Sequence, residues 1–539
     1  MTRRVQRRLP INERSNHQPA GKPEDELARE LAQVVLYSAK VGTIPREPGF
    51  INSLVYFFRL VMRRLLVWYT RPLHEYQSHV THSLNIVQAR LAAPALKMEE
   101  MMAGLRAVTA NVDAAMRQVR HRQADLESDF QQQARFVQLR VTGLQNLLPA
   151  SKAVAARRAG ARNETARDLG QLPFGVNVVG HLRSEKGVGE ALRASLRSLR
   201  AGNIPVCARE FLDPGSQNVE TGRIEGSGNP YRFNLVHMNA DQLSFFAAEN
   251  RAFLTGRYNI GYWNWELASL PWDFYGKFRH LDEVWVPSSF TKASVAEISP
   301  IPVTCIPYSI NPEAAGKPGE TRARFGLPSH AFIFLFVFDF QSYEARKNPR
   351  GLLRAFQEAF GDQTDVLLLI KGSHGDFAPD QLQALQRLCQ KPNVRLLDEV
   401  LPREALNSLL GACDCYVSLH RSEGFGLTMA EAMALGKPVI ATGYSANMDF
   451  MNEDNSFLVR YRLVEIEDDY GPYTHGFLWA EPDLEHAAEL MRRVRGAGQD
   501  VASIAARGRD DVSRKLHPAT IARSMSSRLR EISSYLGIP

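Results

Sequence analysis

The sequence predicts an α/β protein in which two Rossmann-like domains follow an α-helical N-terminal extension. Short apolar runs at 174–180 (FGVNVVG) and 331–338 (AFIFLFVF) have the composition of buried parallel strands, and each precedes a loop and a helical segment. The order of loop, helix, turn and strand recurs around 427–441. Alternation of this kind is typical of parallel sheets covered by helices. The length of 539 residues suits three or four domains, and the hydrophobic share of 44% is that of a chain with sizeable cores.

The extension begins with a polar, partly disordered segment over 1–48 and an amphipathic helix over 49–72. Arginines interrupt the apolar run at 50–70, so it is too polar to span a bilayer. One narrow stripe along this helix collects polar side chains, namely Asn52, Tyr56, Arg59, Arg63 and Thr70. The pattern favours a helix in a membrane interface, with the arginines reaching towards headgroups. The alternative is a helix buried against a partner or against the rest of the chain.

Positive charge is concentrated in the extension. Residues 1–165 hold 25 Lys and Arg against 14 Asp and Glu, a balance of +11, and the remaining residues hold 40 against 44, or −4, which gives the total of +7. We therefore expect the partner of residues 50–71 to be an anionic membrane surface and not a nucleic acid.

A helical or coiled-coil region is predicted over 73–150, followed by a linker over 151–170. Apolar residues repeat every seven positions at Leu105, Val112, Val119 and Leu126. The repeat indicates a homo-oligomer formed through residues 100–148, or a spacer between the enzyme and a membrane.

The first Rossmann-like domain is predicted over 171–312. The loop HLRSEKGVGE follows its first strand and carries Gly187 and Gly189, but it lacks the full G-x-G-x-x-G pattern, which argues against a dehydrogenase. RFNLVHMN is predicted as the second strand and DEVWVPSSF as the last strand and the start of a helix. His237 ends the second strand, where a lone histidine is usually a structural hydrogen-bonding group.

An aromatic stretch at 258–274 surrounds Glu266. Exposed aromatic rings can stack on sugars, although tryptophans often only pack.

The second Rossmann-like domain is predicted over 313–500, and helices at 501–539 are expected to pack back towards the first domain. Arg346 and Lys347 lie between a buried strand and a helix, where they can reach a diphosphate. Lys371 ends the next strand and either contacts a ligand or is solvated. The five cysteines show no metal-ligand spacing, and Cys413 and Cys415 have the pattern of small core residues. A reducing cytosol is implied, and no apolar region follows the basic start, so no secretory signal is expected.

The most informative stretch is SEGFGLTMAEAMALGKPVIAT, at 422–442. It places Glu423 and Glu431 eight positions apart around a glycine-bearing turn, with a helix beginning at Leu427 or Thr428. Glycines allow close approach of a ligand to the backbone, and a helix start favours a phosphate. Carboxylates on both sides can hold sugar hydroxyls, so the pattern predicts a nucleotide-sugar site. The alternative is an ordinary capping box formed by Thr428 and Glu431.

These residues resemble the E-x7-E signature of the retaining glycosyltransferases of family 4, which have the two-domain GT-B fold. The flanking segments LHRS (419–422), GYSANMDFM (443–451) and GPYTHGFLWAEPD (471–483) are similar to a bacterial branch that builds polysaccharide or lipopolysaccharide. The resemblance covers about 174–535. It implies that the first domain binds the acceptor and the second domain binds the donor.

The resemblance also implies roles for individual residues. It assigns catalysis to Glu423, Lys347, Arg346 and His237. It assigns substrate binding to Glu431, Gly424, Phe425, Gly426, Leu427, Thr428, Gly187, Gly189, Lys371 and Glu266. The family usually has an arginine about six residues before the lysine, where this chain has Gln341, so Arg346 is expected to replace it.

The expected reaction moves a hexose, mannose or glucose, from a nucleotide-diphosphate sugar to a polysaccharide or lipid-linked glycan. No cofactor and no metal are expected, because no D-x-D motif lies in a suitable loop. The expected location is the cytoplasmic side of a membrane, on its inner face. The rival interpretation is a catalytically inactive scaffold that keeps the fold and organises a glycan-assembly complex. A sugar phosphorylase would need an inorganic phosphate site that the sequence does not identify.

Overall fold

The computed structural model describes residues 109–110, 169–221, 228–312, 317–496 and 498–539. Apart from the first pair, all of them belong to one compact unit. The predicted membrane-interface helix, coiled coil and linker fall outside the described residues, except for 109–110, which are helical, and 169–170. No helix in the described part of the chain is long and apolar enough to cross a bilayer.

The first domain contains a six-stranded parallel sheet in the order β2-β1-β3-β4-β5-β6. Its strands are β1 (Val176–Gly180), β2 (Val206–Glu210), β3 (Phe233–His237), β4 (Tyr258–Tyr262), β5 (Glu283–Val286) and β6 (Val303–Cys305). Two predictions were wrong here. RFNLVHMN forms the third strand, because the edge strand β2 ends in Arg209 and Glu210 and has no apolar run. DEVWVPSSF is not the last strand, since the three half-buried residues of β6 follow it.

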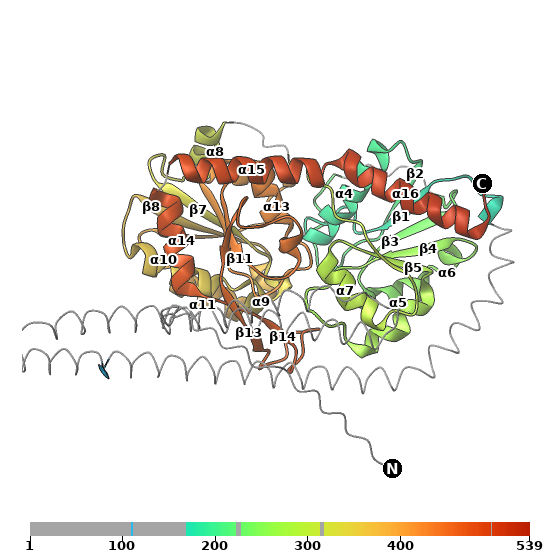
Figure 1. The fold of residues 1–539 in the computed structure, drawn as a ribbon, viewed down its shortest axis with the longest axis horizontal. Coiled ribbons are helices and arrows are strands. Elements are labelled where there is room, and N and C mark those ends of the chain that lie inside the picture. Colours follow the sequence, from blue (N-terminus) through green and yellow to red (C-terminus); the bar gives the residue numbers. More distant parts are fainter. Residues whose placement is uncertain (1–108, 111–168, 222–227, 313–316, 497) are drawn as a thin grey trace, which may run out of the picture. The chain divides into compact units, whose positions relative to one another are not determined.

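Helices cover both faces of this sheet (Figure 1). They are α4 (Gly187–Ala201), α5 (Ala240–Glu249), α6 (Arg251–Leu254), the 3-10 helix η2 (Trp272–His280) and α7 (Ser289–Ile298). α4 begins directly after the loop that follows β1, as the sequence predicts. The strand order reverses between β1 and β3, so the loops that leave these two strands diverge and leave a crevice.

The second domain repeats the plan with the order β12-β11-β10-β7-β8-β9, again all parallel. Its strands are β7 (Phe332–Val337), β8 (Val366–Gly372), β9 (Val394–Asp398), β10 (Cys415–Ser418), β11 (Val439–Thr442) and β12 (Phe457–Val459). The apolar runs that predict β7, β8, β10 and β11 are almost completely buried, as expected of central parallel strands. The order reverses between β10 and β7.

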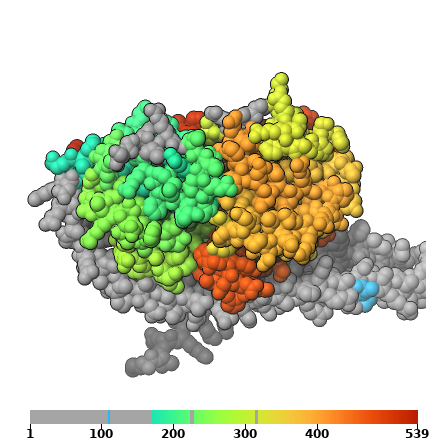
Figure 2. Space-filling model, turned by 180° about the vertical axis from the view of Figure 1, so that it is seen from behind, coloured from blue at the N-terminus to red at the C-terminus, as the bar shows by residue number. Residues whose placement is uncertain are grey.

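Helices of the second domain are α8 (Pro318–Arg324), η3 (Phe340–Ser342), α9 (Glu344–Lys347), α10 (Pro349–Phe360), η4 (Gly375–Phe377), α11 (Pro379–Leu388), α12 (Arg403–Ala412), α13 (Leu427–Ala434), η5 (Ala446–Asp449) and α14 (Leu484–Gly496). A hairpin of β13 (Tyr461–Glu465) and β14 (Leu478–Pro482) projects from this domain. Figure 2 shows this segment, in orange-red, at the boundary between the two domains.

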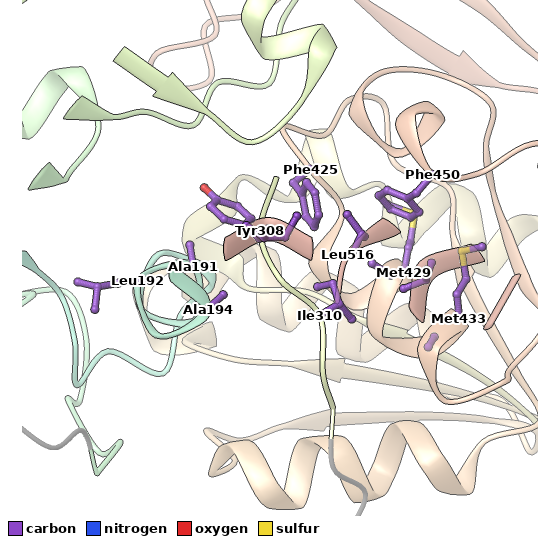
Figure 3. Packing of buried hydrophobic residues seen from close by; sticks show 14 of the residues in the cluster. Ala191, Leu192, Ala194, Tyr308, Ile310, Phe425, Met429, Met433, Phe450 and Leu516 are labelled. Atoms are coloured by element: carbon purple, nitrogen blue, oxygen red, sulfur yellow. The ribbon is translucent and has the colours of Figure 1, made fainter. Parts of the chain in front are cut away.

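The C-terminal helices connect the two domains. α15 (Gln499–Lys515) packs on α13 of the second domain, and α16 (Pro518–Leu536) returns to pack on α4 of the first (Figure 1). A single hydrophobic cluster accordingly runs from α4 through the interdomain connection to α13 (Figure 3). Tyr308 on the connection contacts Phe425, which in turn packs against Phe450. Burial of this cluster holds the glycine-bearing turn before α13 against the first domain.

Candidate active site

The reversal of strand order in the second sheet locates the site. Ligands in open α/β sheets bind beyond the carboxyl ends of the strands at such a point. Here the chain leaving β7 forms α9 and the chain leaving β10 forms the turn 422–426. The residues that the sequence singles out for donor chemistry therefore come from the two strands on either side of the reversal.

The short helix α9 presents Arg346 and Lys347. It is bracketed by two non-glycine residues with positive φ, Tyr343 (65°) and Asn348 (56°). Asn348 is held in this conformation because its side chain donates to Leu419 O and accepts from Gly351 N. Strained backbone of this kind is retained where the surrounding structure fixes it, often at functional sites. The strain aims two consecutive basic side chains at the turn after β10.

Glu423 is the centre of the basic cluster. Its Oε1 is paired with Lys347 Nζ and lies 3.3 Å from Arg346 Nη1. Burial alone would raise the pKa of Glu423, but Lys347 and Arg346 outweigh burial and lower its pKa to about 2. The carboxylate is thus ionised and lies between two cations, and Glu266 of the first domain is a second carboxylate that acts on both of them.

The start of α13 lies immediately beside this charge. Gly426 adopts φ +93°, a left-handed conformation that favours glycine, and it lets the chain turn directly into the helix. The first amides of the helix, from Leu427 onwards, have no carbonyl partner within the helix. Thr428 turns its hydroxyl to the Tyr416 hydroxyl, at 2.7 Å. A phosphate here would meet both the helix dipole and the basic cluster.

The turn is also fixed from the first domain. Gly424 O accepts hydrogen bonds from Ser288 Oγ (2.9 Å) and Thr291 Oγ1 (3.2 Å). A Cβ at position 424 would lie 2.5 Å from Asn264 Oδ1, so only glycine fits without displacing that side chain. The predicted glycine at 424 is therefore required by close packing between domains.

Glu266 joins the site from the first domain. Its carboxylate accepts from Tyr473 Oη (2.8 Å) and from Asn264 Nδ2 (2.8 Å), and its carbonyl oxygen accepts from Ser422 Oγ. The Tyr473 ring lies over Arg346, with the guanidinium carbon 5.7 Å from the ring centroid. The β13–β14 segment thus closes one side of the site and links Glu266 to the basic cluster.

Glu431 occupies a second cluster, further along α13. Its Oε1 is paired with Arg403, whose Nε lies 3.7 Å from Glu190 Oε2 on α4. Burial raises the pKa of Glu431, and Arg403 opposes that rise. Glu190 is surrounded by Arg403, Arg197 and Arg193, which overcome its burial and lower its pKa to about 2.

Other predicted residues lie apart from Glu423. His237 is buried inside the first domain, with Nε2 at 3.0 Å from Ser195 Oγ and its ring stacked on Tyr262, and burial lowers its pKa to about 3. Lys371 is buried beside Asp339 and Asp398, and burial lowers its pKa to about 8 although both carboxylates oppose this. The surroundings of His237 are those of a structural histidine.

The two predicted glycines of the first domain differ from each other. A Cβ at Gly187 would lie 3.7 Å from Leu427 Cδ1, so the start of α4 approaches the start of α13 with room to spare. A Cβ at Gly189 would overlap Ser184 O. Gly189 therefore serves the turn into α4, whereas Gly187 faces the donor side.

Sequence reasoning missed several residues of this region. Arg403 and His374 had no motif around them, Tyr473 lay in the segment GPYTHGFLWAEPD without a role of its own, and each acts on a residue far away in the chain. His374, in a left-handed conformation (φ 59°), lies between Asp339 Oδ2 (3.0 Å) and Glu185 Oε1 (2.9 Å) and so connects the domains. Glu185 and Glu190 lie in the loop HLRSEKGVGE, so that loop was the available signal.

Chemically, the arrangement can bind a diphosphate and stabilise negative charge that develops on it. Carboxylates on either side, Glu423 and Glu431, can accept hydrogen bonds from hydroxyl groups. In the part of the chain that the structure describes, no three His, Cys, Asp or Glu side chains are grouped as metal ligands would be.

Comparison with known proteins agrees with this geometry. Residues 319–494 match the family model "Glycosyl transferases group 1", which supports such a domain in the second half of the chain. D-inositol 3-phosphate glycosyltransferase 1 of Catenulispora acidiphila is 32% identical over 133 residues, covering 23% of this chain and 31% of that protein. The corresponding enzyme of Mycolicibacterium smegmatis is 35% identical over 129 residues, covering 23% and 28%. The chain thus spans less than a third of the length of these relatives.

Among solved structures, sucrose-phosphate synthase of Thermosynechococcus elongatus covers 67% of this chain and 100% of its own, with a TM-score of 0.51 at 16% identity. This likeness concerns the fold. Together with the two parallel sheets and the helix that returns to the first domain, it confirms the predicted GT-B architecture.

Proposed function

We propose that the protein is a retaining glycosyltransferase that transfers a hexose from a nucleotide-diphosphate sugar to a polysaccharide or lipid-linked glycan. The observation that carries the proposal is the cluster of Glu423, Lys347 and Arg346 at the start of α13. These groups come from opposite sides of the strand-order reversal, and together they hold net positive charge next to a free helix start.

The chemistry follows from that charge. As the bond between sugar and diphosphate breaks, negative charge grows on the leaving phosphate. Arg346, Lys347 and the amides at the start of α13 are already oriented to receive it, and preorganised charge of this kind is a large source of catalysis. Arg346 supplies the second cation because Gln341 stands where the family has an arginine, and Gln341 instead donates to Gly215 O (2.8 Å).

Retention of the anomeric configuration requires the acceptor to attack from the face that the diphosphate leaves. In this scheme the leaving phosphate takes the acceptor proton, so a separate protein base is not needed. Glu423 holds the donor sugar hydroxyls, Glu431 the ribose, and Glu266 faces the acceptor side. We also propose that no metal takes part and that the N-terminal extension keeps the enzyme on the inner face of a membrane.

A second candidate is a scaffold that binds no donor. The observation in its favour is the state of Arg346, which is buried, donates to Ser422 O (2.8 Å) and is held by Glu423. If the charge of Arg346 is balanced by these contacts, less positive charge is available to bind a donor diphosphate. The pairing of Glu423 with Lys347 alone would then be a structural ion pair.

Thermal unfolding with a panel of UDP-, GDP-, ADP- and dTDP-sugars distinguishes the two. A donor present at 100 times its Kd should stabilise the protein by about 2.7 kcal/mol. The stabilising donor is then assayed for hydrolysis and transfer in wild type, Glu423→Ala and Lys347→Ala, with and without EDTA. We expect both variants to lose activity and EDTA to have no effect, and NMR of the product to show retained configuration. If no donor stabilises the folded protein, the transferase proposal fails and the scaffold stands.

A further inference from the structure

Arg403 lies between two buried carboxylates that belong to different domains. Its guanidinium is paired with Glu431 Oε1 of the second domain and approaches Glu190 Oε2 of the first. Its backbone N–H donates to Glu220 Oε1 (2.9 Å), a second carboxylate of the first domain. Arg403 begins α12, so the position of its side chain is set by the first turn of that helix.

Glu431 makes only half of the contacts that a buried carboxylate needs. Arg403 occupies Oε1, whereas Oε2 is buried and has no hydrogen-bond partner among the described residues. A buried acceptor without a donor is costly, and such atoms in native proteins usually face a ligand or water. Oε2 thus remains available for a hydroxyl donor.

From this geometry we propose that Arg403 is a positioning residue of the nucleotide site: it anchors Glu431 by one oxygen so that the other accepts from the ribose hydroxyls, and its contact with Glu190 ties this arrangement to closure of the two domains. The inference rests on the proposed function, because it assumes that Glu431 binds the ribose.

Charge balance explains why an arginine is needed. Without Arg403, Glu431 and Glu190 would face each other as like charges in a buried place, which would raise the pKa of Glu431 further. The other charged or titratable groups that face Glu431 are Arg197 on α4 and Tyr416 on β10. Protonation of Glu431 would turn one acceptor into a donor and would weaken its ion pair. Arg403 therefore favours the ionised form of Glu431 and orients its carboxylate.

The two contacts of Arg403 can be separated by substitution. Arg403→Gln removes the anchor of Glu431 and the contact with Glu190. Glu190→Gln removes the charge that Arg403 meets across the domains, together with the ion pairs to Arg193 and Arg197 within α4, and leaves Glu431 anchored. Glu431→Gln leaves a single acceptor oxygen, which the contact with Arg403 occupies, and puts an amide donor in the place of the second oxygen. Arg493→Gln is the matched control, since Arg493 is an exposed arginine paired with Asp500 at 3.0 Å, away from the site.

The test is calorimetric binding of UDP and GDP, and of their 2′,3′-dideoxy counterparts, to the full chain at pH 6.5 and pH 9. In wild type and Arg493→Gln we expect the ribose hydroxyls to strengthen binding roughly tenfold to a hundredfold. In Glu431→Gln this preference falls below about threefold at both pH values. In Arg403→Gln it falls as well, and it is larger at pH 9 than at pH 6.5, because loss of the cation that opposes the burial-raised pKa of Glu431 favours the protonated form. In Glu190→Gln the preference stays, and both ligands bind several-fold more weakly.

A full ribose preference in Arg403→Gln at pH 6.5 would overturn the anchoring role. Unchanged affinities in Glu190→Gln would overturn the coupling to closure. Failure of UDP, GDP, ADP and dTDP to bind folded wild type would overturn the proposed function and this inference together. Circular dichroism and thermal unfolding of each variant establish that it is folded before its binding is compared.

Discussion

The two sheets of this protein share one plan but use it differently. Each is six-stranded and parallel, and each reverses its strand order once, between β1 and β3 in the first domain and between β7 and β10 in the second. At the second reversal, charged side chains converge on Glu423. At the first, His237 turns inward to Ser195, while Glu185 in the loop after β1 and Glu190 in the first turn of α4 contact the second domain.

This difference shows that a reversal of strand order permits ligand binding but does not by itself produce a binding site. Ligand binding there depends on which side chains follow the strand ends. It also depends on whether those side chains already have hydrogen-bond or ion-pair partners within their own domain. The second domain leaves net positive charge at its crevice, so it is suited to bind an anion. The first domain instead supplies contacts that hold the site residues of the second domain in place.

The largest effect is expected for loss of Lys347. Lys347→Ala removes a cation of the leaving-group cluster, and we expect donor cleavage to fall about 10²- to 10³-fold, as for other preorganised electrostatic groups. Lys186→Ala is the matched change at the first reversal, where Lys186 pairs with Asp213 at 3.0 Å. Its effect on the same rate should stay below about tenfold. Equal losses of donor-cleavage rate in the two variants would mean that side chains at both strand-order reversals contribute to catalysis.

Sequence alone reached four strands of the second domain, β7, β8, β10 and β11, because they are uninterrupted apolar runs. It missed the edge strands of both sheets, where short or half-exposed strands need no long apolar run; these are β2, β6, β9 and β12. It also missed the central strand β4, which begins a stretch that stands out only for its aromatic residues. The start of α13 at Leu427 was also predictable, since Gly426 marks the turn.

Site residues were predictable from the sequence only where they lie in a recognisable motif. Glu423 was visible in the E-x7-E signature, and the family resemblance pointed to Lys347, but their ion pair joins residues 76 apart and was not predicted. The bond between Tyr473 and Glu266 joins residues 207 apart, and no local pattern encodes it. Such contacts depend on how the two domains close, which a single sequence does not display.

The glycines of the loop after β1 offer a sharper comparison within the first domain. Gly189→Ala places a methyl group against Ser184 O, and we expect a loss of stability of about 1–3 kcal/mol, as for overpacking. Gly187→Ala has room, so its stability should change by less than about 1 kcal/mol. Urea denaturation measures both. If Gly187→Ala nevertheless weakens donor binding, the first domain approaches the donor at that position, whereas equal destabilisation of both variants would contradict the packing argument.

His237 tests the division of roles directly. His237→Ala loses the contact with Ser195 and the stacking on Tyr262, so we expect a loss of stability of about 1–3 kcal/mol. Turnover of the folded variant should remain within about threefold of wild type, the reverse of the pattern for Lys347→Ala. Denaturation and donor hydrolysis on the same preparation give both numbers. A folded but inactive His237→Ala would show that His237 takes part in the reaction, and the first domain would then also contribute a catalytic residue.

The smallest expected effect is the pH dependence of stability that comes from His374, which contacts Asp339 of the second domain and Glu185 of the first. The hydrogen bond to Asp339 is the main cause that raises the pKa of His374, burial opposes it, and Glu185 adds to the rise. Each ring nitrogen faces a carboxylate, so both can donate only when the ring is protonated. A pKa that is higher in the folded state stabilises fully below about pH 6.5 and loses that stabilisation as pH rises through the raised value.

We expect this stabilisation to be below about 1 kcal/mol, because Glu185 and Asp339 keep other hydrogen-bond donors, Ser216 Oγ and Gln341 N, whether or not the ring is charged. His374→Asn keeps a residue that tolerates positive φ and removes the titrating ring. Thermal unfolding of both proteins between pH 5.5 and 9 should show the advantage of wild type shrinking as pH rises. Lys371, with its pKa lowered to about 8, gives a contribution of opposite sign at the upper end, but it is common to both proteins and cancels in their difference. A difference that stays constant with pH would show that His374 joins the domains by shape and not by charge.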